Sequence, residues 1–117
     1  MSNNKDSRKE ERDFQKAANE VKREIRKEAR EEIKEERKDA KELKKGIEEG
    51  FRDFKKEQRE ADEPGKRDNI SAARKDKKDL KKDINEGSRE AREEIREGRD
   101  FLIDEVNEMK REAREDL

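Results

Sequence analysis

The sequence contains no histidine, cysteine, tryptophan, tyrosine or threonine. Without His and Cys it has no imidazole to act as a general base, no thiol, no disulfide and none of the nitrogen or sulfur ligands that hold zinc. Without Trp and Tyr it has few of the aromatic rings on which nucleic-acid bases stack. We therefore expect no enzyme activity, no catalytic residue, no cofactor, no metal site and no small-molecule substrate, and nucleic acid is not an expected partner.

Apolar residues are also scarce. They make up 24% of the 117 residues, and the longest uninterrupted apolar run is Phe101, Leu102 and Ile103. A membrane-spanning helix needs about 20 such residues, and the first residues lack the apolar region of a signal peptide. We therefore expect a soluble, cytoplasmic protein. A composition this polar is also typical of disordered chains, which keeps a chain that is unfolded in isolation as an alternative.

Charged residues are abundant and balanced. They form 61% of the chain, with 35 Lys and Arg against 36 Asp and Glu, so opposite charges have neighbours with which to pair. Outside the predicted loop most residues are Glu, Lys, Arg or Ala, which are all good helix formers. The one strong interruption is Pro64 followed by Gly65. We predict a single domain over 1–117, with a helix over about 7–62, a loop over about 63–68 and a helix over about 69–116.

Two patterns suggest where these helices begin. Ser7 and Glu10 form the S-x-x-E pattern of a capping box, in which each side chain bonds the backbone of the other residue. Asp68 and Asn69 follow the Pro-Gly loop and are of the types that cap helix N-termini. The sequence therefore predicts helix starts near these residues.

Apolar residues recur every eleven positions in both predicted helices. Eleven residues cover three helical turns, so the stripe that they form runs nearly straight along the helix. The series in the first helix are Ala18, Ala29, Ala40 and Phe51; Phe14, Ile25 and Ile47; and Val21, Leu43 and Phe54. The series in the second helix are Ala73, Ile84, Ile95, Val106 and Leu117; Leu80, Ala91, Leu102 and Ala113; and Gly87, Gly98 and Met109.

The two stripes complement each other when the chain folds back at residues 65–66. Ile25 then lies opposite Val106. Ile33 lies opposite Gly98, so that a large residue faces a glycine as interdigitated packing requires. In the same way Leu43 or Lys44 is expected opposite Gly87. The sequence predicts an all-α fold: a helical hairpin of two long antiparallel helices, joined by a short Pro-Gly loop, with a hendecad coiled-coil interface and the capacity to assemble into a multi-helix bundle.

Charges flank each stripe in the same order, acidic on one side and basic on the other. The acidic flanks include Glu24, Glu28, Asp83, Glu94 and Glu105, and the basic flanks include Lys22, Arg37, Lys44, Lys77, Arg99 and Lys110. Like flanks meet in an antiparallel pair, so the hairpin should have one acidic and one basic edge. Exposed like-charge contacts cost little, and the acidic edge of one copy can pair with the basic edge of another.

These features favour a structural or interaction module, a coiled-coil-type hairpin that self-associates into an oligomer or binds a partner helix. Phe101 and Ile103 lie off the centre of the stripe and are expected to contact a second hairpin. The full set of expected contact residues is Phe14, Ile25, Ile33, Ile47, Phe51, Phe54, Leu80, Ile84, Ile95, Phe101, Leu102, Ile103 and Val106.

Two other functions are weighed against this one. The alternative is a stress-protective or lipid-surface amphipathic protein, disordered until it is bound to a membrane surface or dried. A nucleic-acid or cation binder is a third hypothesis, which the interleaving of Asp and Glu among the basic residues disfavours.

Eleven-residue series such as Ala18, Ala29, Ala40 and Phe51 resemble those of helical-hairpin coiled-coil proteins. The reduced alphabet and the complementary stripes are similar to computationally designed hairpins, although the interior glycines and the presence of only four Leu depart from routine design. A weaker likeness, in period only and over residues 14–61 and 70–117, is to the late-embryogenesis-abundant and apolipoprotein-type repeats. Those proteins coat membranes or protect them during drying, but their repeats favour Ala where this chain has Phe and Ile.

Overall fold

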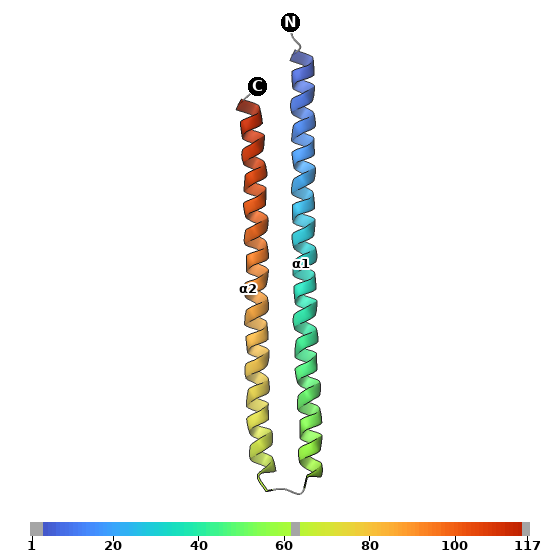
Figure 1. Ribbon diagram of the computed structural model, residues 1–117, viewed down its shortest axis with the longest axis vertical. Helices are drawn as coiled ribbons and strands as arrows, with labels where there is room; N and C mark the ends of the chain where they lie inside the picture. Colours follow the sequence, from blue (N-terminus) through green and yellow to red (C-terminus); the bar gives the residue numbers. More distant parts are fainter. Residues whose placement is uncertain (1–3, 62–63, 116–117) are drawn as a thin grey trace. The chain divides into compact units, whose positions relative to one another are not determined.

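The computed structural model describes residues 4–61 and 64–115 of the chain. Within them, α1 covers Asn4–Glu60 and α2 covers Lys66–Glu115, and no strand occurs in these two ranges. The two helices run antiparallel as a helical hairpin (Figure 1). The all-α hairpin predicted from the eleven-residue period is confirmed. Neither helix has, in its described part, a stretch that is apolar enough to cross a membrane.

Both helices begin earlier than the capping patterns predict. α1 begins at Asn4, so Ser7 lies inside the helix and the predicted capping box at Ser7 is wrong. α2 begins at Lys66, which places Asp68 in its first turn rather than at its cap. A carboxylate at this place is still favourable, because it lies at the positive end of the helix dipole.

The turn before α2 depends on Gly65. Its φ of 87° lies in the left-handed region, which residues with a side chain seldom adopt. Its carbonyl accepts a hydrogen bond of 2.9 Å from the backbone amide of Asn69, so the helical bonding pattern starts at the glycine itself. Asn69 is therefore not the N-cap that the sequence predicts. The predicted helix ends at residues 62 and 116 lie outside the described residues.

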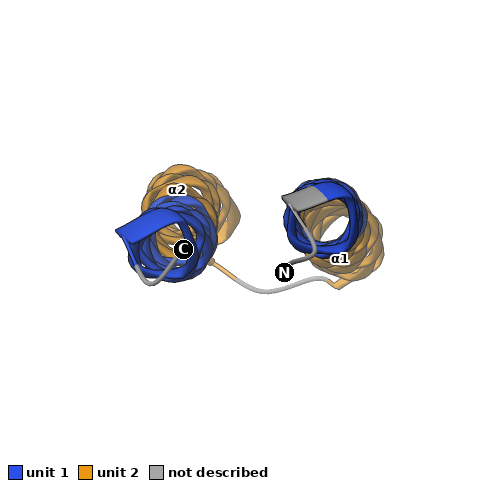
Figure 2. Cartoon of the chain, turned by 90° about the horizontal axis from the view of Figure 1, so that it is seen from above, with its two compact units in different colours: residues 1–33, 93–117 blue, residues 34–92 orange. Residues whose placement is uncertain are grey.

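The hairpin comprises two compact units, each of which contains one segment of α1 and one segment of α2 (Figure 2). Unit 1 consists of residues 1–33 and 93–117, and unit 2 consists of residues 34–92. The buried apolar residues of unit 1 are Ala18, Ala29 and Val106, and unit 2 buries Ala40 and the polar Ser88. Most of the side chains buried between the helices are thus small.

The interface keeps the eleven-residue period, but on α2 it is displaced toward the basic flank. In unit 1, Arg99 and Lys110 are half-buried, whereas Leu102 is 46% and Met109 is 56% exposed. Unit 2 has the same arrangement, with Arg92 half-buried and Leu80 exposed. Lys and Arg can do this because their aliphatic stems cover apolar surface while the charged ends stay in water. The other side of the apolar stripe is therefore left uncovered.

The glycines do not pack against large residues. A Cβ atom built on Gly46, Gly50, Gly87 or Gly98 would meet nothing within 4 Å. The predicted placement of Ile33 against Gly98, and of Leu43 or Lys44 against Gly87, is therefore wrong. All four glycines lie on the acidic side of the stripe, which the displaced interface leaves open.

The helices are also paired in a different register from the predicted one. In unit 1 the Lys22 ammonium bonds Asn107, and in unit 2 the Lys44 ammonium bonds Asn85. The predicted fold-back places residue 24 opposite Asn107 and Gly46 opposite Asn85, so each contact lies two residues from its expected position. Side chains lean toward their own helix N-terminus. In the predicted register this lean would pair Asn107 with a residue after position 24, whereas its observed partner, Lys22, comes before that position. The shift therefore belongs to the backbone pairing.

Candidate functional site

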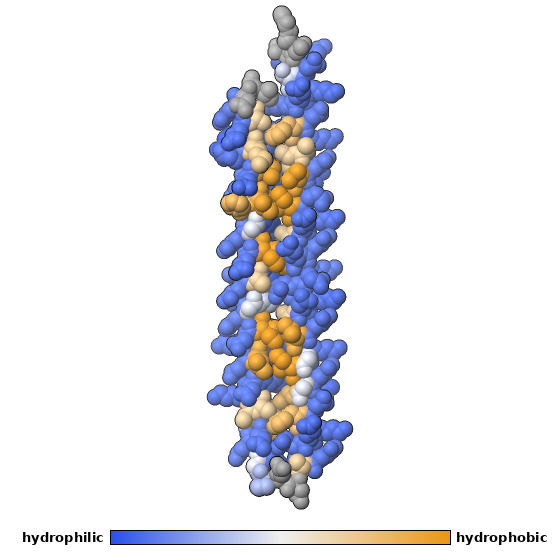
Figure 3. Space-filling model, viewed as in Figure 1, coloured by the Kyte–Doolittle hydropathy of each residue, from blue (hydrophilic) through white to orange (hydrophobic). Residues whose placement is uncertain are grey.

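Unit 1 exposes a strip of apolar side chains, which we call the unit 1 strip. It consists of Phe14 and Val21 from α1, which are 40% and 49% exposed, together with Leu102 and Met109 from α2. These residues lie on one face because both helices carry them on the acidic side of the stripe and antiparallel pairing brings like sides together. Figure 3 shows apolar side chains gathered between α1 and α2 on one face, with polar side chains on both outer sides.

The unit 1 strip contains a gap at Gly98. This glycine occupies the same place in the eleven-residue repeat as Met109, one repeat earlier along α2. Because a Cβ at this position would meet nothing within 4 Å beyond its own stretch of helix backbone, that backbone is open to an approaching molecule there. A glycine inside a helix costs about 1 kcal/mol relative to alanine, and no contact within the described part of unit 1 offsets that cost.

Carboxylates border the unit 1 strip on both sides. On α1, Glu24 and Glu28 line a shallow hollow of about 730 Å³ together with Val21 and Ile25. On α2 the bordering residues, all exposed, are Glu94, Glu105 and Glu112. The strip therefore combines an apolar centre with a negative border, which is a suitable surface for a molecule that is apolar and positively charged.

The opposite face of unit 1 is basic. Burial lowers the pKa of the Lys110 ammonium below its ordinary value, and the neighbouring charges of Lys22 and Arg114 lower it further. Lys22 comes from α1 and the other two residues come from α2, so basic side chains of both helices meet here. This is the arrangement that antiparallel pairing of the flanks predicts.

Asparagines hold these lysines across the interface. Lys22 Nζ donates to Asn107 Oδ1 at 2.9 Å, and Lys110 Nζ donates to Asn19 Oδ1 at 2.9 Å. In unit 2, Lys44 Nζ donates to Asn85 Oδ1 at the same distance. An amide oxygen thus supplies the acceptor where like charges meet.

These asparagines were not among the contact residues predicted from the sequence, although the sequence contains a signal for them. Asn85 and Asn107 occupy the same place in the eleven-residue repeat, and neither lies near a helix end. Asn competes with the helical backbone for hydrogen bonds and is usually confined to caps and turns. Its recurrence in the middle of a helix therefore indicates a specific side-chain partner.

The predicted contact residues separate into three groups. Those that are buried or half-buried in unit 1 are Ile25, Ile33, Ile95, Ile103 and Val106. Those that are half-buried in unit 2 are Ile47, Phe51, Phe54 and Ile84. The exposed ones are Phe14, Leu80, Phe101 and Leu102, with Phe101 the most exposed at 62%. Ile103, expected with Phe101 on the outside, is half-buried on the basic side of α2 instead.

One carboxylate lies among the basic side chains of unit 2. Glu48 Oε1 accepts a hydrogen bond from Lys81 Nζ and lies 3.5 Å from Lys77 Nζ. The Lys77 ammonium also lies 4.5 Å from the centre of the Phe51 ring, a cation–π contact. The hydrogen bond from Lys81 lowers the pKa of Glu48 below its ordinary value; partial burial opposes this shift, and the charges of both lysines add to it.

Replacing Lys81 by Gln should therefore raise the pKa of Glu48 toward its ordinary value. Because the carboxyl pKa is lower in the folded chain, this group stabilises the fold above its unfolded pKa, and the stabilisation is lost as the pH falls through the folded value. An NMR titration of the Glu48 side chain in both proteins measures the shift. Lys75→Gln, on an exposed part of α2, is the control. An unchanged Glu48 pKa in Lys81→Gln would contradict the assignment.

Unit 1 thus combines an open apolar strip, a backbone position without a side chain and carboxylate borders. Comparison of the chain with protein-family models, with curated proteins and with solved structures found no match.

Proposed function

We propose that the chain is an interaction module whose unit 1 strip binds an amphipathic helix with Lys or Arg on both sides of its apolar face. The observation that carries the proposal is the exposure of Leu102 and Met109 beside Gly98, with carboxylates on both sides. Amphipathic helices commonly bind by laying their apolar face into a groove of this kind.

The carboxylate borders determine which helix fits. Cationic side chains flanking the apolar face of a partner would lie against Glu28 on one side and Glu94 or Glu105 on the other. Complementary charge of this kind raises the association rate and selects among partners. A bulky side chain of the partner could also lie over Gly98, where there is no side chain to exclude it.

Other occupants meet a specific obstacle. A second copy placed face to face would bring two sets of carboxylates together, which costs free energy in the absence of cations. An anionic lipid surface would be repelled by the same residues. A second copy can still associate by placing its basic edge against the acidic edge of the first.

The proposal predicts selective binding of a basic amphipathic peptide. Two labelled peptides with the same Leu and Ile stripe, one flanked by Lys and one flanked by Glu, are titrated with the protein and followed by fluorescence anisotropy. We expect the Lys-flanked peptide alone to bind, and Leu102→Ser to weaken its binding by about tenfold. Leu80→Ser is the matched control, since Leu80 is 51% exposed but belongs to unit 2.

Three results would count against this function. Equal loss of binding in Leu80→Ser and Leu102→Ser would show that the contact is not confined to the unit 1 strip. Coil-like circular dichroism that turns helical only with anionic vesicles would favour the lipid-surface alternative. In light scattering, a particle of at least twice the 14.0 kDa chain at low salt that dissociates at high salt would favour self-association through the edges.

A further inference from the structure

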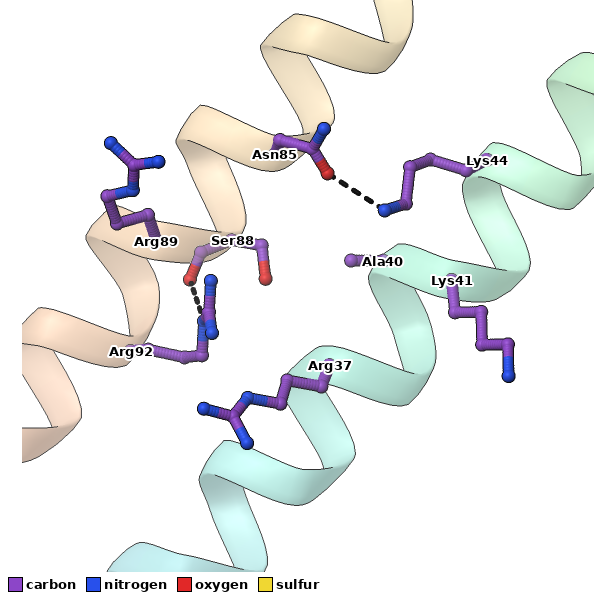
Figure 4. Close-up of a pocket in the computed structure, with 8 residues that line it drawn as sticks. All are labelled: Arg37, Ala40, Lys41, Lys44, Asn85, Ser88, Arg89 and Arg92. Carbon is purple, nitrogen blue, oxygen red and sulfur yellow. Dashed lines mark hydrogen bonds between the residues drawn. The ribbon is translucent and has the colours of Figure 1, made fainter.

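A second site lies on the basic side of unit 2. Facing segments of α1 and α2 enclose a hollow of about 530 Å³ (Figure 4). Five of the eight residues that line the hollow are cations, and none is a carboxylate. The eight residues are Arg37, Ala40, Lys41, Lys44, Asn85, Ser88, Arg89 and Arg92. All the charged residues of this lining are thus basic, although the chain as a whole has 36 acidic and 35 basic residues.

The hollow exists because its two central residues are small. Ala40 from α1 and Ser88 from α2 are each only 6% exposed, and neither can fill the space between the longer side chains around it. In Figure 4 the side chains of Arg37 and Arg92 extend into this space from opposite helices. Lys44 also points across this space, toward Asn85, whereas the charged ends of Lys41 and Arg89 point outward, so the positive charge inside the hollow comes from Arg37, Lys44 and Arg92.

The cations that line the hollow have N–H groups that remain free to donate hydrogen bonds to a ligand. None of the five forms a salt bridge with a carboxylate of the described residues. Lys44 donates one hydrogen bond to Asn85, and Arg92 Nε donates one of 3.2 Å to the Ser88 carbonyl. An ammonium group has three N–H donors and a guanidinium has five, so most of them remain available.

The positive surface also continues along α2. A neighbouring hollow of about 450 Å³ shares Asn85 and Arg89 with the first and adds Lys78, Lys82 and Lys81, the last of which is paired with Glu48; Glu86 is the single carboxylate among the lining residues. The first hollow itself spans about two turns of each helix, or about 10 Å. A ligand that carries negative charge along its length would therefore contact more of these cations than a single small anion.

We propose that the hollow between Arg37, Lys44 and Arg92 binds a polyphosphate chain, either an inorganic one or the triphosphate of a nucleotide. Guanidinium groups bind phosphate oxygens in pairs, and ammonium groups add point charges. This site is separate from the unit 1 strip, so it holds or fails independently of the function proposed for that strip.

Isothermal titration calorimetry of the full chain with inorganic tripolyphosphate tests the proposal. Arg37→Gln with Lys41→Gln removes two lining cations that are exposed and outside the helix interface. We expect this double variant to bind tripolyphosphate about tenfold more weakly at low salt. Lys56→Gln with Arg67→Gln makes the same change of charge on exposed positions of unit 2 and should alter the affinity by less than about twofold.

The other arms of the titration each decide a part of the proposal. Binding of ATP with a similar affinity supports a site for the phosphate chain, whatever is attached to it, whereas binding of tripolyphosphate alone supports the inorganic ligand. Orthophosphate binding as tightly as tripolyphosphate would overturn the requirement for a chain. Equal weakening in the two double variants, or no binding by the unaltered protein, would overturn the site.

Discussion

Replacing Gly46, Gly50, Gly87 and Gly98 by alanine is expected to raise the free energy of unfolding by about 1 kcal/mol at each position and by about 3–4 kcal/mol together. Each glycine lies inside a helix, and an added methyl group would meet nothing within 4 Å. The gain therefore comes from the lower conformational freedom of alanine in the unfolded chain. Urea unfolding followed by circular dichroism measures it.

Gly65 supplies the matched control. An added Cβ would meet nothing there either, but its φ of 87° strains any residue with a side chain. Gly65→Ala should therefore lower stability by about 1 kcal/mol while the four helical substitutions raise it. If the four substitutions lowered stability, the glycine face would have to be covered in the free protein.

Gly98→Ala separates stability from binding. It should stabilise the free chain and at the same time weaken binding of the Lys-flanked peptide, because the methyl group would occupy the gap in the unit 1 strip. Gly46→Ala, in unit 2, should give the gain in stability without the loss of binding.

The second large effect is expected at Ala29, which is 6% exposed in the interface of unit 1. Ala29→Leu would force a larger side chain between the helices, and overpacking of this kind costs about 1–3 kcal/mol. Ala17→Leu, at an exposed position of the same helix, should change the free energy of unfolding by less than about 0.5 kcal/mol. Urea unfolding of both variants measures the difference. A stabilised Ala29→Leu would show that small residues are not needed there.

The fold followed from the sequence because one long-range regularity dominates it. The eleven-residue period places Ala18, Ala29 and Ala40 on one line of α1, and Pro64 with Gly65 interrupts the helix only once. Helix propensity, stripe and turn all favour the same hairpin, and agreement of this kind makes a fold predictable. The position at which α2 starts was harder to predict from the sequence, because Gly65 initiates the helix through its backbone conformation rather than through a capping side chain.

The details of the interface could not be obtained in the same way. Apolar patterning assumes that Leu80 and Leu102 lie inside, but the aliphatic stems of Lys81 and Arg92 are half-buried in unit 2 while Leu80 is exposed. A scale that treats Lys and Arg only as charged cannot anticipate this choice. The register then shifts as well, because hydrogen bonds such as that from Lys44 to Asn85 depend on particular side chains rather than on the period.

The candidate sites were predictable only in outline. The separation into an acidic and a basic edge follows from the flanking charges. Phe101 was expected off the centre of the stripe and is exposed, whereas the exposure of Leu102, a member of the stripe, was not expected. The hollow beside Ala40 and Ser88 was missed, because it requires two small residues from segments about 48 positions apart to face each other among cations.

The thin interior has a thermal consequence. Among the described residues only Ala18, Ala29, Ala40 and Val106 are buried apolar side chains. The heat capacity of unfolding is set mainly by the apolar surface that becomes hydrated, with polar surface contributing in the opposite sense. This chain should therefore unfold with a small heat-capacity increment, and its stability should vary gently with temperature, with little tendency to denature in the cold.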